Sequence, residues 1–297
     1  MTTLSYDPTH CTLCPRRCGA DRTQAKGRCR MPDAPVVARA ALHHWEEPPL
    51  SGTQGAGTVF FSGCSLGCVF CQNDSISQND FGKAISVARL REIFFELIAA
   101  GAHNIDLVNP THYAHAVAQA LEDPLPVPVV WNSGGYDRVE TLAALEGKIQ
   151  IYLPDYKYTD PDTARRYAGA ADYPETARAA IREMVRQTGP YQLDENGILT
   201  RGVILRHLLL PGGLNQAKEV MDWVAETFPP HTILFSLMSQ YTPWGKATDY
   251  PPLDRRLRKS EIRAAEAYFT NLDLDGFTQG VEAAQAEYIP TFDLTGV

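Results

Sequence analysis

The stretch "GTVFFSGCSLGCVFCQN", residues 57–73, decides how the whole chain is interpreted. It begins with an apolar run that predicts a strand over residues 58–63, and it continues into Cys64, Cys68 and Cys71 with the spacing C-x3-C-x2-C. Three thiols are too few for a closed structural zinc site, and disulfides need pairs. The loop therefore predicts either a metal group with one coordination position left open or a zinc site that another residue completes.

Alternating strand-like and helix-like segments fill most of the remaining chain. Short apolar runs that end at polar, Gly or Pro residues predict further strands over 104–110, 128–134, 149–155, 202–212 and 232–240. Amphipathic stretches between them predict helices over 86–101, 111–122, 137–147, 172–189, 215–228 and 259–272. Such alternation produces parallel strands joined by right-handed crossovers. The predicted fold class is α/β, a partial (β/α)6 TIM-like barrel with a Cys-rich N-terminal metal-binding segment.

Three regions follow from this pattern. We expect a Cys-rich metal-binding segment over residues 1–50, the barrel over 51–246, and a C-terminal helix and tail over 247–297 that pack on the barrel. Residues 1–50 show no sustained periodicity, and the tail after residue 272 is expected to be irregular.

Composition and charge narrow the classes of function. The 297 residues are 44% hydrophobic and 21% charged, with a net charge of −8, so a nucleic-acid partner is not expected. No apolar run reaches the roughly 18–20 residues that span a bilayer. The N-terminal residues lack the basic and apolar regions of a signal peptide. We expect a cytoplasmic protein with no membrane association.

Seven cysteines, all within the first 71 residues, indicate metal binding rather than disulfides. In addition to the central trio, Cys11, Cys14, Cys18 and Cys29 offer four soft ligands, which suit a closed tetrahedral site. Structural zinc, a second iron–sulfur cluster and free or redox-switching thiols all remain open for these four.

Polar residues end several predicted strands and so mark a binding face. They are Asn109, Asn132 with Ser133, Asp155 with Lys157, and Gln240. Asp155 and Lys157 are two apart, so they point to one side as either functional groups or an exposed ion pair. Arg206 interrupts an apolar strand and must face the cavity or pair with a carboxylate.

Two histidines near the second strand are a weaker candidate. His112 and His115 lie three apart on a predicted helix and so share a face. They are interpreted as a partly solvated helix start, with a metal-binding pair as the alternative.

The trio, with Phe70 directly before its last cysteine, resembles the cluster-binding loop of radical S-adenosylmethionine (SAM) enzymes. More narrowly, the chain is similar to the subgroup of pyruvate formate-lyase activating enzyme-like proteins that is known as the second activase homologue. The segments that carry this likeness are "FCQNDSIS" (70–77), "CTLCPRRCGADRTQAKGRC" (11–29), "LVNPTHY" (107–113), "DYKY" (155–158) and "LMSQYTPWG" (237–245).

The resemblance implies a chemistry and a site. A [4Fe–4S] cluster on the three thiolates would leave one iron free to bind the amino and carboxylate groups of SAM. Reductive cleavage would give methionine and a 5′-deoxyadenosyl radical that abstracts hydrogen from a substrate, which makes the protein an oxidoreductase. Many relatives carry Gly-Gly-Glu where this chain has "NPTHY" (109–113). Residues implied to contact SAM are Phe70, Asn109, Asn132, Ser133, Asp155, Lys157, Arg206 and Gln240.

The sequence leaves two classes of substrate open. The subgroup implies a glycine of a partner protein, as in a glycyl-radical activase, while modification of a small molecule or peptide is the alternative. An external one-electron reductant of the flavodoxin or ferredoxin type is the implied partner. A second class of function is a non-catalytic zinc or iron–sulfur protein, and a third, pure electron transfer, conflicts with the incomplete thiolate set.

Overall fold

The computed structural model describes residues 4–279 and 290–297. Its strands are β1 (Val36–His43), β2 (Ala56–Phe61), β3 (Lys83–Ala84), β4 (Ile105–Val108), β5 (Val129–Ser133), β6 (Ile151–Pro154), β7 (Gln192–Leu193), β8 (Leu199–Leu208), β9 (Leu234–Met238) and β10 (Gly276–Gln279). Its helices are α1 (Pro48–Ser51), α2 (Asp74–Ser77), α3 (Val87–Ala99), α4 (Ala114–Ala120), α5 (Val139–Ala143), α6 (Pro161–Ala168), α7 (Tyr173–Thr188), α8 (Leu214–Thr227) and α9 (Lys259–Thr270), with the short 3₁₀ helices η1 (Thr111–Tyr113) and η2 (Ala247–Asp249).

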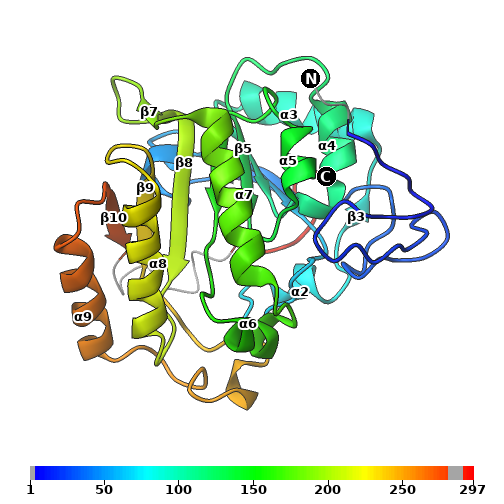
Figure 1. Cartoon of the computed structure of the whole chain (residues 1–297). Coiled ribbons are helices and arrows are strands. Elements are labelled where there is room, and N and C mark those ends of the chain that lie inside the picture. The colour runs from blue at the N-terminus through cyan, green and yellow to red at the C-terminus, as the bar shows by residue number, and fades with distance from the viewer. Residues whose placement is uncertain (1–3, 280–289) are drawn as a thin grey trace.

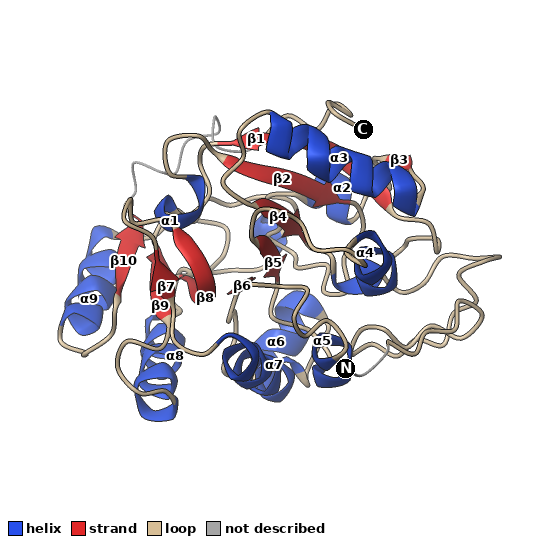
Figure 2. Ribbon diagram, turned by 90° about the horizontal axis from the view of Figure 1, so that it is seen from above, coloured by secondary structure: helices blue, strands red, loops and turns tan. Residues whose placement is uncertain are grey.

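The strands form one sheet in the order β10-β9-β8-β6-β5-β4-β2-β1-β3, and β7 pairs with β8. All neighbours from β2 to β10 along this path are parallel, whereas β1 is antiparallel to both β2 and β3. The strands follow an arc, with α7, α8 and α9 outside it (Figure 2). This arrangement confirms the predicted α/β partial barrel.

The six predicted strands correspond to β2, β4, β5, β6, β8 and β9, and the six predicted helices also form. Helix α3 shows why: Leu90, Ile93, Phe94 and Leu97 are buried on one face, and the Ser86 hydroxyl accepts a hydrogen bond from the Arg89 amide. Apolar spacing and an N-terminal cap therefore define this helix. Figure 1 shows the helices packed beside the sheet and the blue N-terminal segment as an irregular loop at one side.

Four strands were not predicted: β1, β10 and the two-residue strands β3 and β7. The expectation of an irregular tail after residue 272 is wrong, because β10 extends the sheet in parallel to β9, from Gly276 opposite Phe235 to Gln279 opposite Met238. Within residues 1–50, β1 pairs with β2 from Val37 to His43. Both strands are bonded to the barrel through contacts distant in sequence, which short alternation patterns do not reveal. The boundaries at residues 50 and 246 stay a prediction.

The interpretation of His112 and His115 as a partly solvated helix start is wrong. His112 lies in η1 and is buried, with Nε2 2.8 Å from the Ser62 carbonyl oxygen. Burial lowers the pKa of His112 to about 3. His115 stacks on Tyr6, lies 3.2 Å from Asp33, and has a pKa lowered to about 4, again mainly by burial. Both histidines are interior packing residues with different partners.

The barrel interior is layered. At the base, Leu50 of α1 packs with Val130, Ile151, Ile204 and Leu234 from four strands. Because α1 closes this end, the polar residues above it have access from the opposite, carboxyl ends of the strands. In the described residues we find no helix with both the length and the apolar character needed to cross a bilayer.

Candidate active site

A pocket of about 280 Å³ lies at the carboxyl ends of the parallel strands. Residues at or just beyond the ends of β2, β4, β5, β6, β8 and β9 line it, as expected for a binding face in a parallel sheet. The structure brings all eleven residues predicted for the central site to this one pocket: Cys64, Phe70, Cys68, Cys71, Asn109, Asn132, Ser133, Asp155, Lys157, Arg206 and Gln240.

The three-cysteine loop directs hydrogen-bond donors at its sulfur atoms. The Leu66 amide lies 3.4 Å from Cys64 Sγ, and the Ser77 hydroxyl lies 3.4 Å from Cys71 Sγ. The Tyr158 hydroxyl lies 3.5 Å from Cys68 Sγ. Donors of this kind stabilise thiolates that hold a metal or cluster and tune its potential.

Burial opposes ionisation of these thiols in the protein alone. It raises the pKa of Cys71 to about 12, and it raises the pKa of Cys68 despite the nearby positive charge of Lys157. A buried thiol becomes a thiolate when a bound metal compensates its charge. Thiols buried in this way are poor free nucleophiles, and a bound metal would compensate the charge of their thiolates.

Phe70 forms an apolar wall of the pocket. Its ring is 6.0–6.5 Å from the rings of Tyr158, Tyr167 and Tyr241, all in edge-on arrangements. Tyr167 comes from α6, a helix that was not predicted and that Asp160 caps at its first turn. These aromatic contacts fix the last turn of the cysteine loop and keep water from one side of it.

Asp155 and Lys157 form a partly buried ion pair, with Nζ 2.6 Å from Oδ2 and side chains 14% and 20% exposed. The alternative of an exposed surface pair is therefore wrong. Burial would raise the pKa of Asp155, but the charges of Arg206 and Lys157 outweigh it, and the net shift is downward. Asp155 is thus a carboxylate between two cations.

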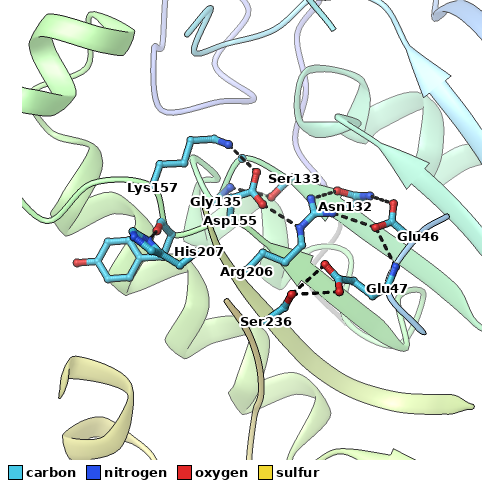
Figure 3. A network of polar contacts seen from close by, with 12 residues as sticks. Glu46, Glu47, Asn132, Ser133, Gly135, Asp155, Lys157, Arg206, His207 and Ser236 are labelled. Atoms are coloured by element: carbon cyan, nitrogen blue, oxygen red, sulfur yellow. Dashed lines mark hydrogen bonds and ion pairs between the residues drawn. The ribbon is translucent and has the colours of Figure 1, made fainter. Parts of the chain in front are cut away.

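Arg206 lies between Asp155, Asn132 and Glu46 and fulfils both of its predicted alternatives (Figure 3). It lines the pocket, and it also pairs with two carboxylates: Nε is 2.9 Å from Asp155 and Nη1 is 3.0 Å from Glu46. Its Nη2 donates to the Asn132 amide oxygen at 2.7 Å. Asn132 in turn donates to Glu46 at 3.1 Å. Strands β5, β6 and β8 are therefore joined by one charged network at the floor of the pocket.

Glu46 and Glu47 are candidate functional residues that the sequence analysis did not identify. They precede α1, which inserts into the barrel base, so both carboxylates reach the interior. Glu47 accepts hydrogen bonds from Ser236 at 3.1 Å and from Gln279 at 2.6 Å. Burial raises the pKa of Glu47 to about 7, although the charge of Arg206 acts in the opposite direction.

Asp106 of β4 adds a third acid to this layer. It is fully buried, its Oδ2 is 3.5 Å from the Asn132 amide nitrogen and 3.4 Å from the Thr58 hydroxyl, and its Oδ1 has no hydrogen-bond partner. Burial, then the charge of Glu46, raises its pKa well above the usual range. Asp106 is thus an acid whose charged form is disfavoured by burial.

Three predicted residues use their side chains to shape the pocket. Asn109 has a positive φ of 60° and donates to the Gly63 carbonyl at the start of the cysteine loop. The Ser133 hydroxyl donates to Asp137 at 2.5 Å. Gln240 donates to Gln279 of β10 at 2.7 Å. All three residues line the pocket, and their roles towards a ligand stay predictions.

The N-terminal cysteines lie outside this pocket. Cys11, Cys14 and Cys29 are buried, Cys18 is exposed, and all seven cysteines are free thiols. Over the described residues, no three or more His, Cys, Asp or Glu side chains are arranged to hold a single metal ion. A cubane cluster makes a different demand on Cys64, Cys68 and Cys71, because each thiolate binds a different iron.

Comparison with solved structures places the fold. Streptococcus suis SuiB bound to S-adenosylmethionine superposes with a TM-score of 0.52 at 16% identity, over 75% of this chain and 50% of SuiB. SuiB bound to the precursor peptide SuiA superposes with a TM-score of 0.50 at 15% identity, over 73% of this chain and 46% of SuiB. The chain thus spans about half the length of the SuiB chains that it matches, and the likeness is one of fold.

Comparison with sequences places the family. No protein-family model matches the chain. The uncharacterized protein MJ0674 of Methanocaldococcus jannaschii is 30% identical over 279 residues, which cover 89% of this chain and 76% of that protein. Identity at this level across most of both chains indicates common descent and a common fold. The chain belongs to the family of MJ0674.

Proposed function

We propose that the protein is a radical SAM enzyme in which Cys64, Cys68 and Cys71 hold a [4Fe–4S] cluster with one open iron. The observation that carries the proposal is the loop itself: three free thiols in one pocket, each approached by an N–H or O–H donor at 3.4–3.5 Å. This donor set fits sulfur ligands of a cluster, since hydrogen bonds to the sulfurs stabilise their negative charge.

The chemistry that such a cluster supplies, when bound and reduced, is one-electron cleavage of SAM to methionine and a 5′-deoxyadenosyl radical that abstracts hydrogen from a substrate. The residues of the chain bind and orient the reactants. Lys157 presents a positive charge to the SAM carboxylate, and Asp155 holds that ammonium group at 2.6 Å while Arg206 holds Asp155 at 2.9 Å. Phe70 and the tyrosines around it exclude water from the cluster side of the pocket.

Asn132 and Ser133, at the end of β5, are proposed to contact the SAM ribose or carboxylate, and Asn109 and Gln240 to border its amino group and the rim. SuiB, a protein of the same fold, was solved with S-adenosylmethionine bound, which supports SAM as the ligand class. Electrons would come from an external reductant of the flavodoxin or ferredoxin type.

For the substrate, we propose a peptide or protein segment. If the protein is a glycyl-radical activase, the hydrogen is taken from a glycine Cα of a partner protein. SuiB was also solved bound to a precursor peptide, which supports a peptide as the substrate class in this proposal. Modification of a small molecule is the alternative. Presenting defined peptides, partner proteins and small metabolites to the reduced enzyme distinguishes these classes by which of them acquires a carbon-centred radical.

Electron paramagnetic resonance (EPR) of anaerobically purified, reduced protein tests the site. We expect brown protein with iron and sulfide, an EPR signal of a reduced [4Fe–4S] cluster, and a change in that signal when SAM is added. Replacing any one of Cys64, Cys68 and Cys71 by Ala should abolish the SAM-dependent change. Colourless protein with zinc at both cysteine sets would support the non-catalytic alternative.

A further inference from the structure

The N-terminal segment contains a buried charge that the described residues do not balance. Arg22 is 1% exposed, and no carboxylate of residues 4–279 or 290–297 forms an ion pair with it. Asp33, which is close in sequence, instead accepts a hydrogen bond from Tyr6 and lies 3.2 Å from His115. An unbalanced guanidinium in a protein interior is strongly unfavourable, so a negative partner is expected.

The partners that Arg22 does have are only dipoles, a ring and a sulfur. Its Nη1 donates to the His112 carbonyl at 2.6 Å and its Nη2 to the Pro32 carbonyl at 2.5 Å. The guanidinium lies 5.2 Å from the centre of the Tyr113 ring. Nη1 also lies 3.8 Å from Cys11 Sγ, and Nε has no partner.

The four N-terminal cysteines gather next to this arginine. Reciprocal backbone hydrogen bonds of 3.0 Å join Cys11 to Gly19 and Ala20, which places Cys18 beside Cys11. On the other side, a Cβ placed on Gly27 would lie 3.4 Å from Cys29 Sγ and 3.6 Å from Cys18 Sγ. The electrostatic environment of Cys14 includes the other three thiols. Four soft ligands and one cation thus share a small region.

We infer that Cys11, Cys14, Cys18 and Cys29 form a second metal site of four thiolates, with Arg22 as its internal counter-charge. Four thiolates around a zinc ion or a [4Fe–4S] cluster leave a net negative charge, which is the partner that Arg22 lacks. In this structure the thiols do not surround one ion, so binding closes them together, as in other small segments whose folding depends on metal. When a zinc ion or a preassembled cluster binds, each thiol loses its proton to solvent and no electron is transferred.

The second site supports the loop that carries the central trio. The Cys64 amide donates to the Cys29 carbonyl at 3.3 Å, and Arg16 donates through Nε to the Ser65 carbonyl at 2.8 Å. Met31 and the Cys29 carbonyl approach Gly63 so closely that any Cβ there would collide with them. Closing the four thiolates therefore fixes the backbone on which Cys64 depends.

Metal analysis of a variant without the central trio tests the inference separately from the proposed function. In the full-length chain with Cys64, Cys68 and Cys71 all replaced by Ala, we expect one metal centre per chain after anaerobic exposure to zinc, or to iron and sulfide. Zinc identifies a structural site, and iron with sulfide identifies a second cluster. If the variant binds neither zinc nor an iron–sulfur cluster, the inference is overturned. SAM cleavage by the unaltered protein would not be affected by that result. Should the triple variant not fold, Cys18→Ala in the otherwise unaltered chain must lose one centre.

Arg22 is tested by substitution as a positioning residue. Arg22→Met removes the charge and is expected to weaken metal binding by about 10–100-fold in competition with a chelator, the usual effect of losing a group that supports metal ligands. Arg22→Lys, which keeps the charge, should recover part of the affinity. Arg28→Met is the matched control, because Arg28 is exposed and adjacent to Cys29. Equal affinity in the Arg22→Met variant and the control would exclude the counter-charge role.

Discussion

Arg206 Nε lies 2.9 Å from Asp155 Oδ1, so a cation near the carboxyl end of β8 is bonded to a carboxylate just beyond the end of β6. The pair lies between the SAM-binding face proposed above and the acidic interior that Glu46 and Glu47 form. The same Asp155 bonds to Lys157 through its other oxygen. Changes at this network should therefore separate effects on cofactor binding from effects on stability.

Lys157→Met tests the proposed contact with the SAM carboxylate. A hydrogen bond to a charged group contributes about 1.5–3 kcal/mol, so the dissociation constant for SAM should rise about 10–100-fold while cluster content stays unchanged. Equilibrium binding to the reconstituted protein measures this. Lys148→Met is the control, since Lys148 precedes β6 at the opposite end of the strand and donates to the Leu121 carbonyl. Unaltered SAM affinity in Lys157→Met would remove this residue from the site.

Arg206→Met should destabilise the fold. It leaves the carboxylates of Asp155 and Glu46 in the interior with fewer partners, and breaking a buried pair in this way costs about 3–5 kcal/mol. Urea unfolding of the two proteins gives the difference. Adding Glu46→Gln to the Arg206→Met variant should restore part of the loss, because it removes one unpaired charge. Arg263→Met, at an exposed position of α9 with no side-chain hydrogen bond or ion pair in the described structure, should change stability little; equal losses at both arginines would contradict the network.

Glu47 makes stability depend on pH in a predictable direction. Its pKa of about 7 in the folded chain exceeds the usual value of 4.5, so between these pH values the folded state retains a proton that the unfolded state has released. The free energy of unfolding should therefore fall as pH rises through this window, by roughly 3 kcal/mol from this residue. Glu47→Gln should lack that contribution.

Urea unfolding at pH 5 and pH 8 checks the effect of Glu47. The Glu47→Gln variant should gain stability relative to the unaltered protein as pH rises, whereas Glu195→Gln, at an exposed position, should follow the unaltered protein at both values. Parallel pH profiles for all three proteins would show that Glu47 does not hold a proton in the fold.

Tyr158→Phe tests the hydrogen bonds aimed at the sulfur atoms. The Tyr158 hydroxyl lies 3.5 Å from Cys68 Sγ, and removing it should lower the reduction potential of the cluster, because a donor that stabilises the added electron is lost. Redox titration followed by EPR measures the potential. Tyr167→Phe is matched, since Tyr167 packs on the same Phe70 ring and forms no hydrogen bond to a cysteine in the described structure. Equal potentials would mean that the hydroxyl does not act on the cluster.

The sequence predicted the strands whose residues are apolar and whose ends are polar, and it placed the pocket because the carboxyl ends of parallel strands meet. It failed for β10, whose four residues "GFTQ" (276–279) give no period, and for β1, whose alanines suit helix and strand alike. What identifies both as strands is pairing with a neighbour in the sheet, a contact between residues that no local pattern contains.

Only part of the charged network at the floor of the pocket could be predicted from the sequence. An arginine within an apolar strand requires a partner, so Arg206 itself signalled a buried network. Its partner Glu46 lies 160 residues away in "HWEEPP" (44–49), a segment with no periodic pattern. Only the insertion of α1 into the barrel base brings the two together. A charge that needs a partner is readable from sequence, whereas the identity of the partner is a property of the fold.

The most direct measurement of the central claim is product analysis after anaerobic reduction of the reconstituted protein with SAM. The proposed open iron at Cys64, Cys68 and Cys71 requires 5′-deoxyadenosine and methionine to appear, and requires each single Cys→Ala variant of the trio to form neither. Absence of 5′-deoxyadenosine from protein that holds a reducible cluster, or its formation at the unaltered rate in any of these variants, would contradict the account.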